Sequence, residues 1–233
     1  MTDIPYATAL IVGAGPGISA SVARALSKAG LKVALAARDT DKLGELAAGI
    51  GARSFAVDVA DPSAVERLFR QVDETLGPPD LVVFNAGARV RGPIVELDPE
   101  AVRRVLEVSA LGGFCVVQQA AARMAPKGRG AILLTGATAS VKGFPLSSSF
   151  AMGKFALRGL AQSAARELGP QGIHVAHFVI DGGVRSAVRG DPDDRPDSTL
   201  DPDAIAQTYL AVLSQPRNAW TWEIELRPWV EAF

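Results

Sequence analysis

Short apolar runs alternate along the chain with longer segments in which apolar residues recur at helical spacing. Such alternation is typical of repeated strand–helix units and a parallel sheet. Short continuous runs such as TALIVG and KVALAA indicate strands that are buried on both faces. We predict strands at Thr8–Gly13, Lys32–Ala37, Ser54–Asp58, Asp80–Asn85, Ala131–Thr135, His174–Ile180 and, at an edge of the sheet, Trp220–Leu226.

The longer periodic segments predict helices between these strands. They lie at Ile18–Ala29, Asp39–Gly49, Pro62–Leu76, Asp98–Met124, Ser148–Leu168 and Pro202–Leu213. Gly169-Pro170 is a strong helix stop, and the polar segment Gly190–Ser198 predicts an exposed loop. We expect one doubly wound, Rossmann-type α/β domain over residues 1–233, with about seven mostly parallel strands and a loop near 184–200 that covers the substrate.

Composition narrows the class of protein further. Of the 233 residues, 48% are apolar and 21% are charged, and the formal net charge is −1. No basic surface is therefore expected for nucleic acid, and no Lys/Arg-rich amphipathic stretch for a membrane surface. No window reaches the roughly eighteen apolar residues of a membrane span. The single cysteine, Cys115, and the absence of a signal-peptide pattern in Met1–Ala9 predict a cytoplasmic protein.

The first predicted strand runs into a glycine-rich loop and then directly into a helix. Glycines permit a tight turn and let a pyrophosphate approach the backbone, while the helix N-terminus supplies N–H donors. The spacing departs from G-x-G-x-x-G, and a plain strand-to-helix turn is the alternative explanation. The position favours binding of a dinucleotide by Gly13, Gly15, Pro16, Gly17 and Ile18.

The end of the second strand bears on the choice of cofactor. An NAD site offers a carboxylate to the ribose 2′-hydroxyl, whereas an NADP site prefers an arginine. Here the strand ends in Arg38, which favours NADP over NAD, with an ordinary solvated side chain as the alternative. Asp39 follows, and we expect it to precede or cap the next helix.

The ends of the third and fourth strands supply further candidates. Asp58, followed by Val59, can accept a hydrogen bond from an adenine amino group. Asn85, Ala86 and Gly87 would line the crevice at the carboxyl ends of the strands. Alternatively, each of these residues could simply stabilise the turn in which it lies. Together they lie where a ligand binds on such a sheet, so the sequence predicts dinucleotide binding.

These segments resemble the short-chain dehydrogenase/reductase family over essentially the whole chain. The resemblance rests on the glycine-rich loop, Asp58-Val59, Asn85-Ala86-Gly87 and Lys154. The family fingerprint Thr-Gly-x-x-x-Gly-x-Gly is altered at its first and last positions, which are Val12 and Ser19 here. The resemblance implies a nicotinamide cofactor and homodimers or homotetramers built on two long helices.

The family also has a Pro-Gly turn after the sixth strand. Here that turn reads Val179-Ile180-Asp181-Gly182-Gly183-Val184 and lacks the proline. The resemblance implies that Gly182 and Val184 contact the cofactor from this turn.

The catalytic apparatus of the family is an Asn-Ser-Tyr-Lys tetrad, and three of its positions differ in this chain. The Tyr-x-x-x-Lys motif falls on Phe150 and Lys154, whose i, i+4 spacing places both on one helix face. The serine aligns with Ala137, or with Thr138 after a one-residue slip, and the asparagine aligns with Ser109. The resemblance therefore implies an atypical subgroup with Phe for Tyr and a retained lysine.

The missing hydroxyl of Phe150 removes the family's proton donor. A positioned general acid contributes about 10²–10⁴-fold in rate, whereas the positioning of hydride donor and acceptor is a separate contribution. The family's lysine both tunes the tyrosine and hydrogen-bonds the nicotinamide ribose. The second role alone would explain Lys154, with a surface lysine as the alternative.

Other polar groups near the motif are candidates to replace the acid. Thr138 has an aliphatic hydroxyl that is better suited to orienting a substrate oxygen. A helix N-cap explains the Ser147–Ser149 run more simply. Asp181 can hold a raised pKa and donate a proton, or it can cap the turn with Gly182-Gly183, which we favour.

The histidines and the aromatic tail have simpler explanations. We expect His177 in the core between apolar neighbours, and His174, at the start of its strand, in solvent. Subunit contact or core packing would equally explain the aromatic residues near the C-terminus. These are Trp220, Trp222, Trp229 and Phe233.

The leading hypothesis is an NADP-dependent oxidoreductase that transfers hydride to an activated C=C bond or a carbonyl of a small molecule. Loss of three tetrad positions with the cofactor side retained leaves two alternatives. One is a non-catalytic NADP-binding sensor or assembly subunit, and the other is a non-redox lyase or isomerase.

Overall fold

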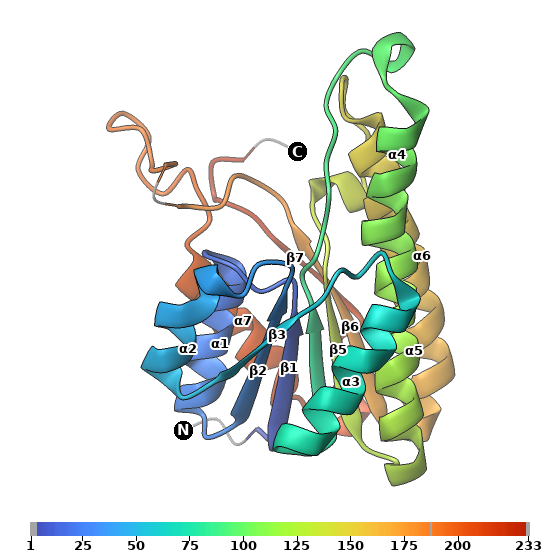
Figure 1. Cartoon of the computed structure of the whole chain (residues 1–233). Coiled ribbons are helices and arrows are strands. Elements are labelled where there is room, and N and C mark those ends of the chain that lie inside the picture. Colours follow the sequence, from blue (N-terminus) through green and yellow to red (C-terminus); the bar gives the residue numbers. More distant parts are fainter. Residues whose placement is uncertain (1–3, 187, 232–233) are drawn as a thin grey trace.

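A single parallel sheet organises the chain. In the computed structural model, which describes residues 4–186 and 188–231, seven strands pair in the order β3-β2-β1-β4-β5-β6-β7 (Figure 1). The strands are β1 (Thr8–Val12), β2 (Lys32–Ala37), β3 (Arg53–Ala56), β4 (Leu81–Phe84), β5 (Gly130–Thr135), β6 (Ile173–Ile180) and β7 (Glu223–Leu226). The predicted doubly wound Rossmann-type fold is confirmed. The predicted edge strand is β7, which begins three residues after Trp220.

Helices cover both faces of this sheet. On one face lie α1, α2 and α7, and on the other lie α3, α5 and α6, with α4 extending past the end of the strands (Figure 1). Their bounds are α1 (Ile18–Lys28), α2 (Gly44–Ile50), α3 (Pro62–Leu76), α4 (Pro99–Leu106), α5 (Gly112–Met124), α6 (Ser148–Leu168) and α7 (Pro202–Leu213).

Three of the helices begin at an Asp-Pro pair. In each, the aspartate carboxylate accepts a hydrogen bond from the backbone N–H two residues later, and the proline occupies the first turn. These pairs are Asp61-Pro62, Asp98-Pro99 and Asp201-Pro202. The starts of α3, α4 and α7 are thus set by local chemistry.

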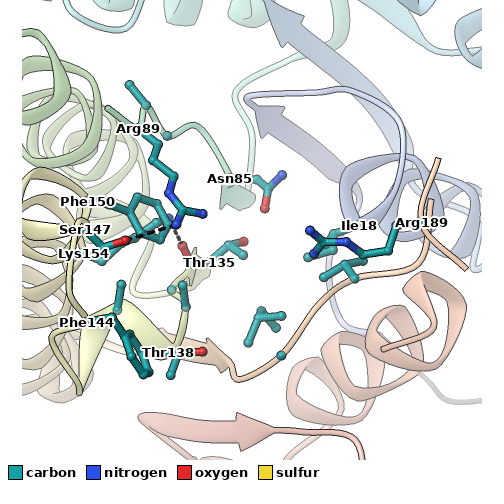
Figure 2. Close-up of a pocket in the computed structure, with 18 residues that line it drawn as sticks. Ile18, Asn85, Arg89, Thr135, Thr138, Phe144, Ser147, Phe150, Lys154 and Arg189 are labelled. Atoms are coloured by element: carbon teal, nitrogen blue, oxygen red, sulfur yellow. Dashed lines mark hydrogen bonds between the residues drawn. The ribbon is translucent and has the colours of Figure 1, made fainter. Parts of the chain in front are cut away.

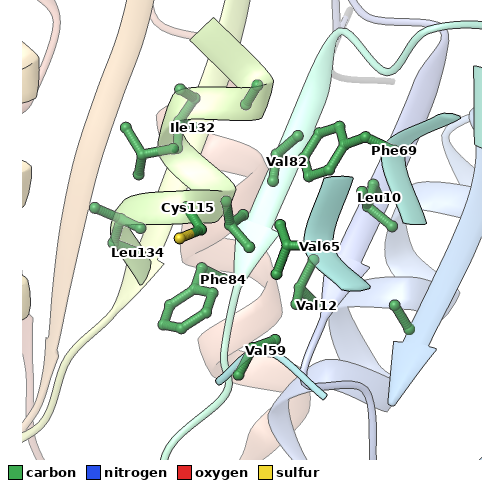
Figure 3. Close-up of a cluster of buried hydrophobic side chains, with 14 of the residues drawn as sticks. Leu10, Val12, Val59, Val65, Phe69, Val82, Phe84, Cys115, Ile132 and Leu134 are labelled. Carbon is green, nitrogen blue, oxygen red and sulfur yellow. The ribbon is translucent and has the colours of Figure 1, made fainter. Parts of the chain in front are cut away.

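Strand residues alternate between two hydrophobic layers. Along β1, Leu10 and Val12 enter the layer beneath α3, α5 and α6, whereas Ala9 and Ile11 enter the layer beneath α1 and α7. Figure 3 shows the first layer, where Cys115 lies among these apolar side chains. Burial on both faces holds the strands rigidly, so the loops at their carboxyl ends have fixed positions.

The predicted helix Asp98–Met124 corresponds to α4 and α5, which are joined by a π-helical turn at Glu107–Leu111. With its final turn, Pro99–Lys127 contains an 18-residue window with a mean hydropathy of 1.4, so by length and composition alone it could cross a membrane. Half of that window is buried inside the fold, as in a core helix of a soluble protein.

The histidine and tryptophan predictions have mixed outcomes. His177 is buried as expected, but the prediction that His174 lies in solvent is wrong. The His174 ring stacks on Trp220 at 4.6 Å, and its Nε2 lies 2.8 Å from the Thr221 carbonyl, because β7 covers this strand. Trp229 is 81% exposed, and Phe233 lies outside the described residues.

Candidate functional site

A cavity of about 330 Å³ opens at the carboxyl ends of β1, β2 and β4. It lies where the chain reverses its direction of winding, between β1 and β4, which is the usual ligand site of such sheets. Most of the residues predicted to bind a dinucleotide line it. They are Gly13, Gly15, Pro16, Arg38, Asp58, Val59, Asn85, Ala86 and Gly87.

The glycine loop is packed tightly against the end of β4. Gly13 has φ +85°, and a Cβ there would lie 2.3 Å from the Ala86 nitrogen. Ser19, which stands at the last glycine of the fingerprint, donates to the Gly13 carbonyl at 3.0 Å and accepts from the Asn85 side-chain amide at 2.8 Å. Sequence reasoning missed this link, which ties the loop to β4.

The first turn of α1 remains available to a ligand. Its N-cap residue, Gly17, provides no side chain to the N–H groups, and a Cβ at Gly15 or Gly17 would meet open space. Gly17 does not line either cavity, whereas Ile18 lines the neighbouring one. Backbone N–H groups at this position suit an anion.

Two cations and one carboxylate surround the end of β2. Arg38 and Lys42 line the cavity with Asp39, whose carboxylate lies 2.9 Å from the Lys42 ammonium. Asp39 also accepts a hydrogen bond from the Asp41 N–H at 3.2 Å. Thr40, and not Asp39, is the N-cap of the helical turn that follows. The carboxylate is thus engaged locally, while Arg38 is exposed beside the cavity.

Asp58 faces the same cavity and forms an ion pair with Arg104 of α4. Burial raises the pKa of this carboxyl, but the Arg104 guanidinium and the Ala60 N–H outweigh burial and lower it overall. The Asp58 carboxylate is therefore ionised and can accept a hydrogen bond from an adenine amino group.

A second cavity, of about 550 Å³, adjoins the first at Asn85, Gly87 and Ala88. Its lining includes five more predicted residues from α6, from the loop after β5 and from the turn after β6. They are Thr138, Phe150, Lys154, Gly182 and Val184. The predicted catalytic and cofactor groups therefore meet in one continuous crevice, with the exceptions of Gly17 and Ser109.

Lys154 is buried at the floor of this second cavity. Its ammonium donates to the Thr135 carbonyl at 2.8 Å, and only 5% of the residue is exposed. Burial lowers the pKa of Lys154 from 10.5 to about 8. A surface lysine, the alternative considered from sequence, is thus excluded.

The ring of Phe150 lies close to both Arg89 and Lys154 (Figure 2). The Lys154 Nζ lies 5.9 Å from the ring centre, and the Arg89 Cζ lies 5.3 Å from it. Arg89 Nη2 donates to the Ser147 Oγ at 3.1 Å. Ser147 is the N-cap residue of α6, as the serine run predicted, but its side chain makes no capping hydrogen bond.

Ser109 does not reach the cavity. It is fully buried in the π-helical turn, its Oγ accepts a 3.4 Å hydrogen bond from the Ala88 N–H, and it packs against Gly153 of α6. A Cβ on Gly153 would lie 2.9 Å from the Ser109 Cβ. Its contacts join the π-helical turn to α6 and to the loop after β4.

Asp181 is paired, and the hypothesis of a raised pKa is wrong. Burial raises the pKa of this carboxyl, but hydrogen bonds from Thr138 and Arg227 outweigh burial and lower it. The Thr138 hydroxyl is thereby held beside the cavity, and Asp181 stays ionised. Arg227 lies just after β7, so the sequence near Asp181 did not indicate this partner.

The comparisons with known proteins agree with this geometry. The family model described as short chain dehydrogenase matches residues 7–195. The chain therefore belongs to the short-chain dehydrogenase/reductase family of oxidoreductases.

Individual relatives cover nearly the whole chain. An uncharacterized oxidoreductase of Staphylococcus saprophyticus is 30% identical over 98% of this chain and 100% of its own. A short-chain dehydrogenase structure from Rhodopseudomonas palustris is 36% identical, with a TM-score of 0.82 over 96% of this chain and 99% of that one. An alcohol dehydrogenase of the archaeon Thermococcus sibiricus, complexed with 5-hydroxy-NADP, is 27% identical, with a TM-score of 0.86 over 97% and 98%.

Proposed function

We propose that this protein binds NADP(H) and transfers hydride to or from a small molecule, as an atypical family member in which Phe150 replaces the catalytic tyrosine. The observation that carries the proposal is the junction of the two cavities at Asn85, Gly87 and Ala88. The crevice leads from Arg38 at one end to Lys154 at the other, as an extended dinucleotide requires.

The residues that line the crevice fit this cofactor. Open space beside Gly15 and Gly17, with the uncapped start of α1, suits the pyrophosphate, and Asp58 suits the adenine amino group. Lys154, buried and facing the cavity, suits the nicotinamide ribose. Gly182 and Val184 would close over the nicotinamide end. When bound, the nicotinamide supplies or accepts the hydride.

NADP is the preferred form in this proposal. Arg38 and Lys42 contribute two positive charges to the end of β2 against the single charge of Asp39. An arginine beside the 2′ position suits a phosphate, whereas a free carboxylate there would repel it. The ligand of the Thermococcus sibiricus enzyme supports the same choice.

Proton transfer falls to Lys154 in this arrangement. Phe150 has no proton to give, and Thr138 has an aliphatic hydroxyl that lowers the pKa of the neighbouring Asp181. A cavity-lining ammonium with a pKa of about 8 is a competent general acid near neutral pH. This chemistry suits reduction of an activated C=C bond, where the resulting carbanion takes a proton from the lysine, or reduction of a carbonyl.

A non-catalytic NADP-binding role is the second candidate. It is favoured by the position of Ser109 outside both cavities and by the lack of a hydroxyl on Ala137 and Phe150. Transfer of deuterium from 4-deuterated NADPH to any product in a substrate panel would exclude this role.

The cofactor preference is tested by titrating NADPH and NADH into the wild type, Arg38→Ala and the control Arg53→Ala. Arg53 is an exposed arginine of β3 that does not line the crevice. We expect NADPH to bind at least about tenfold more tightly than NADH, a difference of roughly 1.4 kcal/mol. Arg38→Ala removes this preference and Arg53→Ala keeps it. Equal affinities in the wild type would contradict the assignment of NADP.

We further propose a homodimer or homotetramer built on α5 and α6. Large apolar side chains on these helices and the preceding turn are exposed, namely Leu111, Phe114, Met152 and Phe155. Such a patch is typical of a subunit interface. Light scattering after size-exclusion chromatography should show an oligomer that Phe114→Arg converts to a monomer.

A further inference from the structure

Arg89 places a fixed cation at the mouth of the proposed substrate cavity. Its Nη2 donates to Ser147, and its guanidinium lies over the Phe150 ring. The adjoining residue Val90 is also fastened to α6, because the Ser149 hydroxyl donates to its carbonyl at 2.7 Å. Two serines at the start of α6 thus hold this segment in place.

The lining of this cavity carries positive charge. Among the described residues that line it are Arg89, Lys154 and Arg189 but no carboxylate. Among the described residues neither arginine forms an ion pair, and Lys154 donates to the neutral carbonyl of Thr135. Figure 2 shows Arg89 on the side of Phe150 and Ser147, with Arg189 across the cavity beside Ile18. A cavity lined by charges of one sign attracts a ligand of the opposite sign.

Phe150 supplies no acceptor that would offset this positive charge. Two cations lie within 6 Å of its ring centre, at 5.3 Å and 5.9 Å, and the ring provides no oxygen between them. Contact with an aromatic face compensates a cation only weakly when water is near. In the part of the chain that the structure describes, no protein acceptor contacts the Nε and Nη1 of Arg89. A planar group with free donors matches a carboxylate in a two-point contact.

Apolar side chains form the rest of the same wall. Phe144, Ile180 and Val184 line the cavity with Phe150. A ligand that satisfies both features has an apolar body and one anionic end.

We propose that Arg89, positioned by Ser147, binds the carboxylate of the substrate, so that the protein acts on carboxylic acids with an apolar body. This inference rests on the proposed function, because it assigns the substrate class of that site. Arg189 lies on the opposite side of the cavity beside Ile18, where we expect it to face the cofactor and not the substrate. With the carboxylate bound to Arg89, the body of the acid would extend along the apolar wall toward Lys154.

The test uses benzoate as the probe and benzamide as its neutral isostere, titrated calorimetrically into the protein with and without saturating NADPH. We expect benzoate to bind at least about tenfold more tightly than benzamide, with a preference that weakens as salt is added. Arg89→Met should remove the preference while leaving benzamide binding unchanged. Ser147→Ala should reduce it severalfold, since the guanidinium loses its anchor.

Arg91→Met is the matched control, because Arg91 is an exposed arginine of the same segment that does not line the cavity. It should keep the full preference for benzoate. Equal binding of benzoate and benzamide by a wild type that binds NADPH overturns this inference alone. Failure to bind NADPH overturns the proposed function, and the titration without cofactor then still decides whether Arg89 selects a carboxylate.

Discussion

Lys154 lies one helical turn after Phe150 on α6, and its ammonium is 5.9 Å from the centre of the Phe150 ring. The lysine is buried and hydrogen-bonded to the Thr135 carbonyl, so its position does not depend on a hydroxyl at residue 150. A tyrosine introduced there would place its hydroxyl near two of the cavity's cations, Arg89 and Lys154. Both cations would favour the ionised phenol and lower its pKa.

Phe150→Tyr should therefore create or raise carbonyl reductase activity. A positioned acid contributes about 10²–10⁴-fold, so a gain of that order is expected in kcat/KM for ketones and aldehydes. The measurement is NADPH consumption across a panel of carbonyl compounds.

Two further variants separate acid catalysis from repacking in this experiment. Phe150→Leu should show no gain, and Lys154→Met in the tyrosine background should remove it. If Phe150→Tyr binds NADPH normally but gains nothing, the site has diverged beyond one hydroxyl, with Ala137 and Ser109 as the next positions to restore.

Lys154→Met should stabilise the protein at neutral pH while weakening NADPH binding. The folded-state pKa of about 8 lies below the ordinary value of 10.5, so the unfolded chain binds more protons between these values. Stability therefore rises with pH across that window, and the buried cation is unfavourable below it. We expect a gain of about 2 kcal/mol at pH 7, after loss of the hydrogen bond to Thr135, and a smaller gain at pH 10.

Urea unfolding at the two pH values measures this effect, with Lys28→Met as the control. Lys28 is exposed at the end of α1, so its loss should change stability by about 0.5 kcal/mol or less. A destabilised Lys154→Met at pH 7 would mean that the hydrogen bond outweighs the cost of burial.

Much of the fold could be predicted because its determinants are local. The apolar spacing of α7 predicted its bounds, and Gly169-Pro170 predicted the end of α6. Strands buried on both faces stand out as apolar runs, and the glycine loop between β1 and α1 places the crevice. The residues that line the first cavity could be predicted because they follow the ends of strands.

The rest of the site depends on contacts between distant segments. Arg89 and Ser147 are 58 residues apart, and Asp181 and Arg227 are 46 apart, so neither pair leaves a mark in local spacing. The π-helical turn at Glu107–Leu111 shifts the helix by a fraction of a turn, which apolar periodicity does not reveal. The burial of His174 was missed because the residues that contact its ring, Trp220 and Thr221, come 46 and 47 residues later in the chain.

Gly13→Ala should destabilise the fold and abolish NADPH binding. The added Cβ would lie 2.3 Å from the Ala86 nitrogen and 2.5 Å from its Cα, and φ is +85°, where side chains are strained. These atoms belong to the backbone, which cannot move aside as easily as a side chain, so we expect a loss of about 3 kcal/mol in unfolding free energy.

Gly15→Ala is the matched control for this glycine. It has open space around its Cβ position and no positive φ, so its stability should change by about 0.5 kcal/mol or less. Thermal and urea unfolding of the two variants provide the comparison. Similar stabilities for both would mean that the loop moves away from β4 at little cost.

Stability should fall as the pH is lowered from 6.5 toward 4, with His177 as the main cause. Burial lowers the pKa of His177 from 6.5 to about 4, against the opposing effect of the Glu223 carboxylate 3.0 Å from its Nδ1. The folded state keeps the ring neutral while the unfolded chain takes up a proton, so stability is lost through this window. The full effect is about 3 kcal/mol.

His177→Gln should flatten this dependence when urea unfolding is measured at pH 7, 5.5 and 4.5. His174→Gln should also flatten it in part, because burial lowers the pKa of His174 as well. Glu223 adds to the loss of stability near pH 4.5 and below, because the Arg158 guanidinium, whose Nε lies 2.6 Å from its Oε2, lowers the pKa of that carboxyl in the folded state. An unchanged slope in His177→Gln would assign the acid sensitivity to other groups, because removing the ring removes its proton from both states.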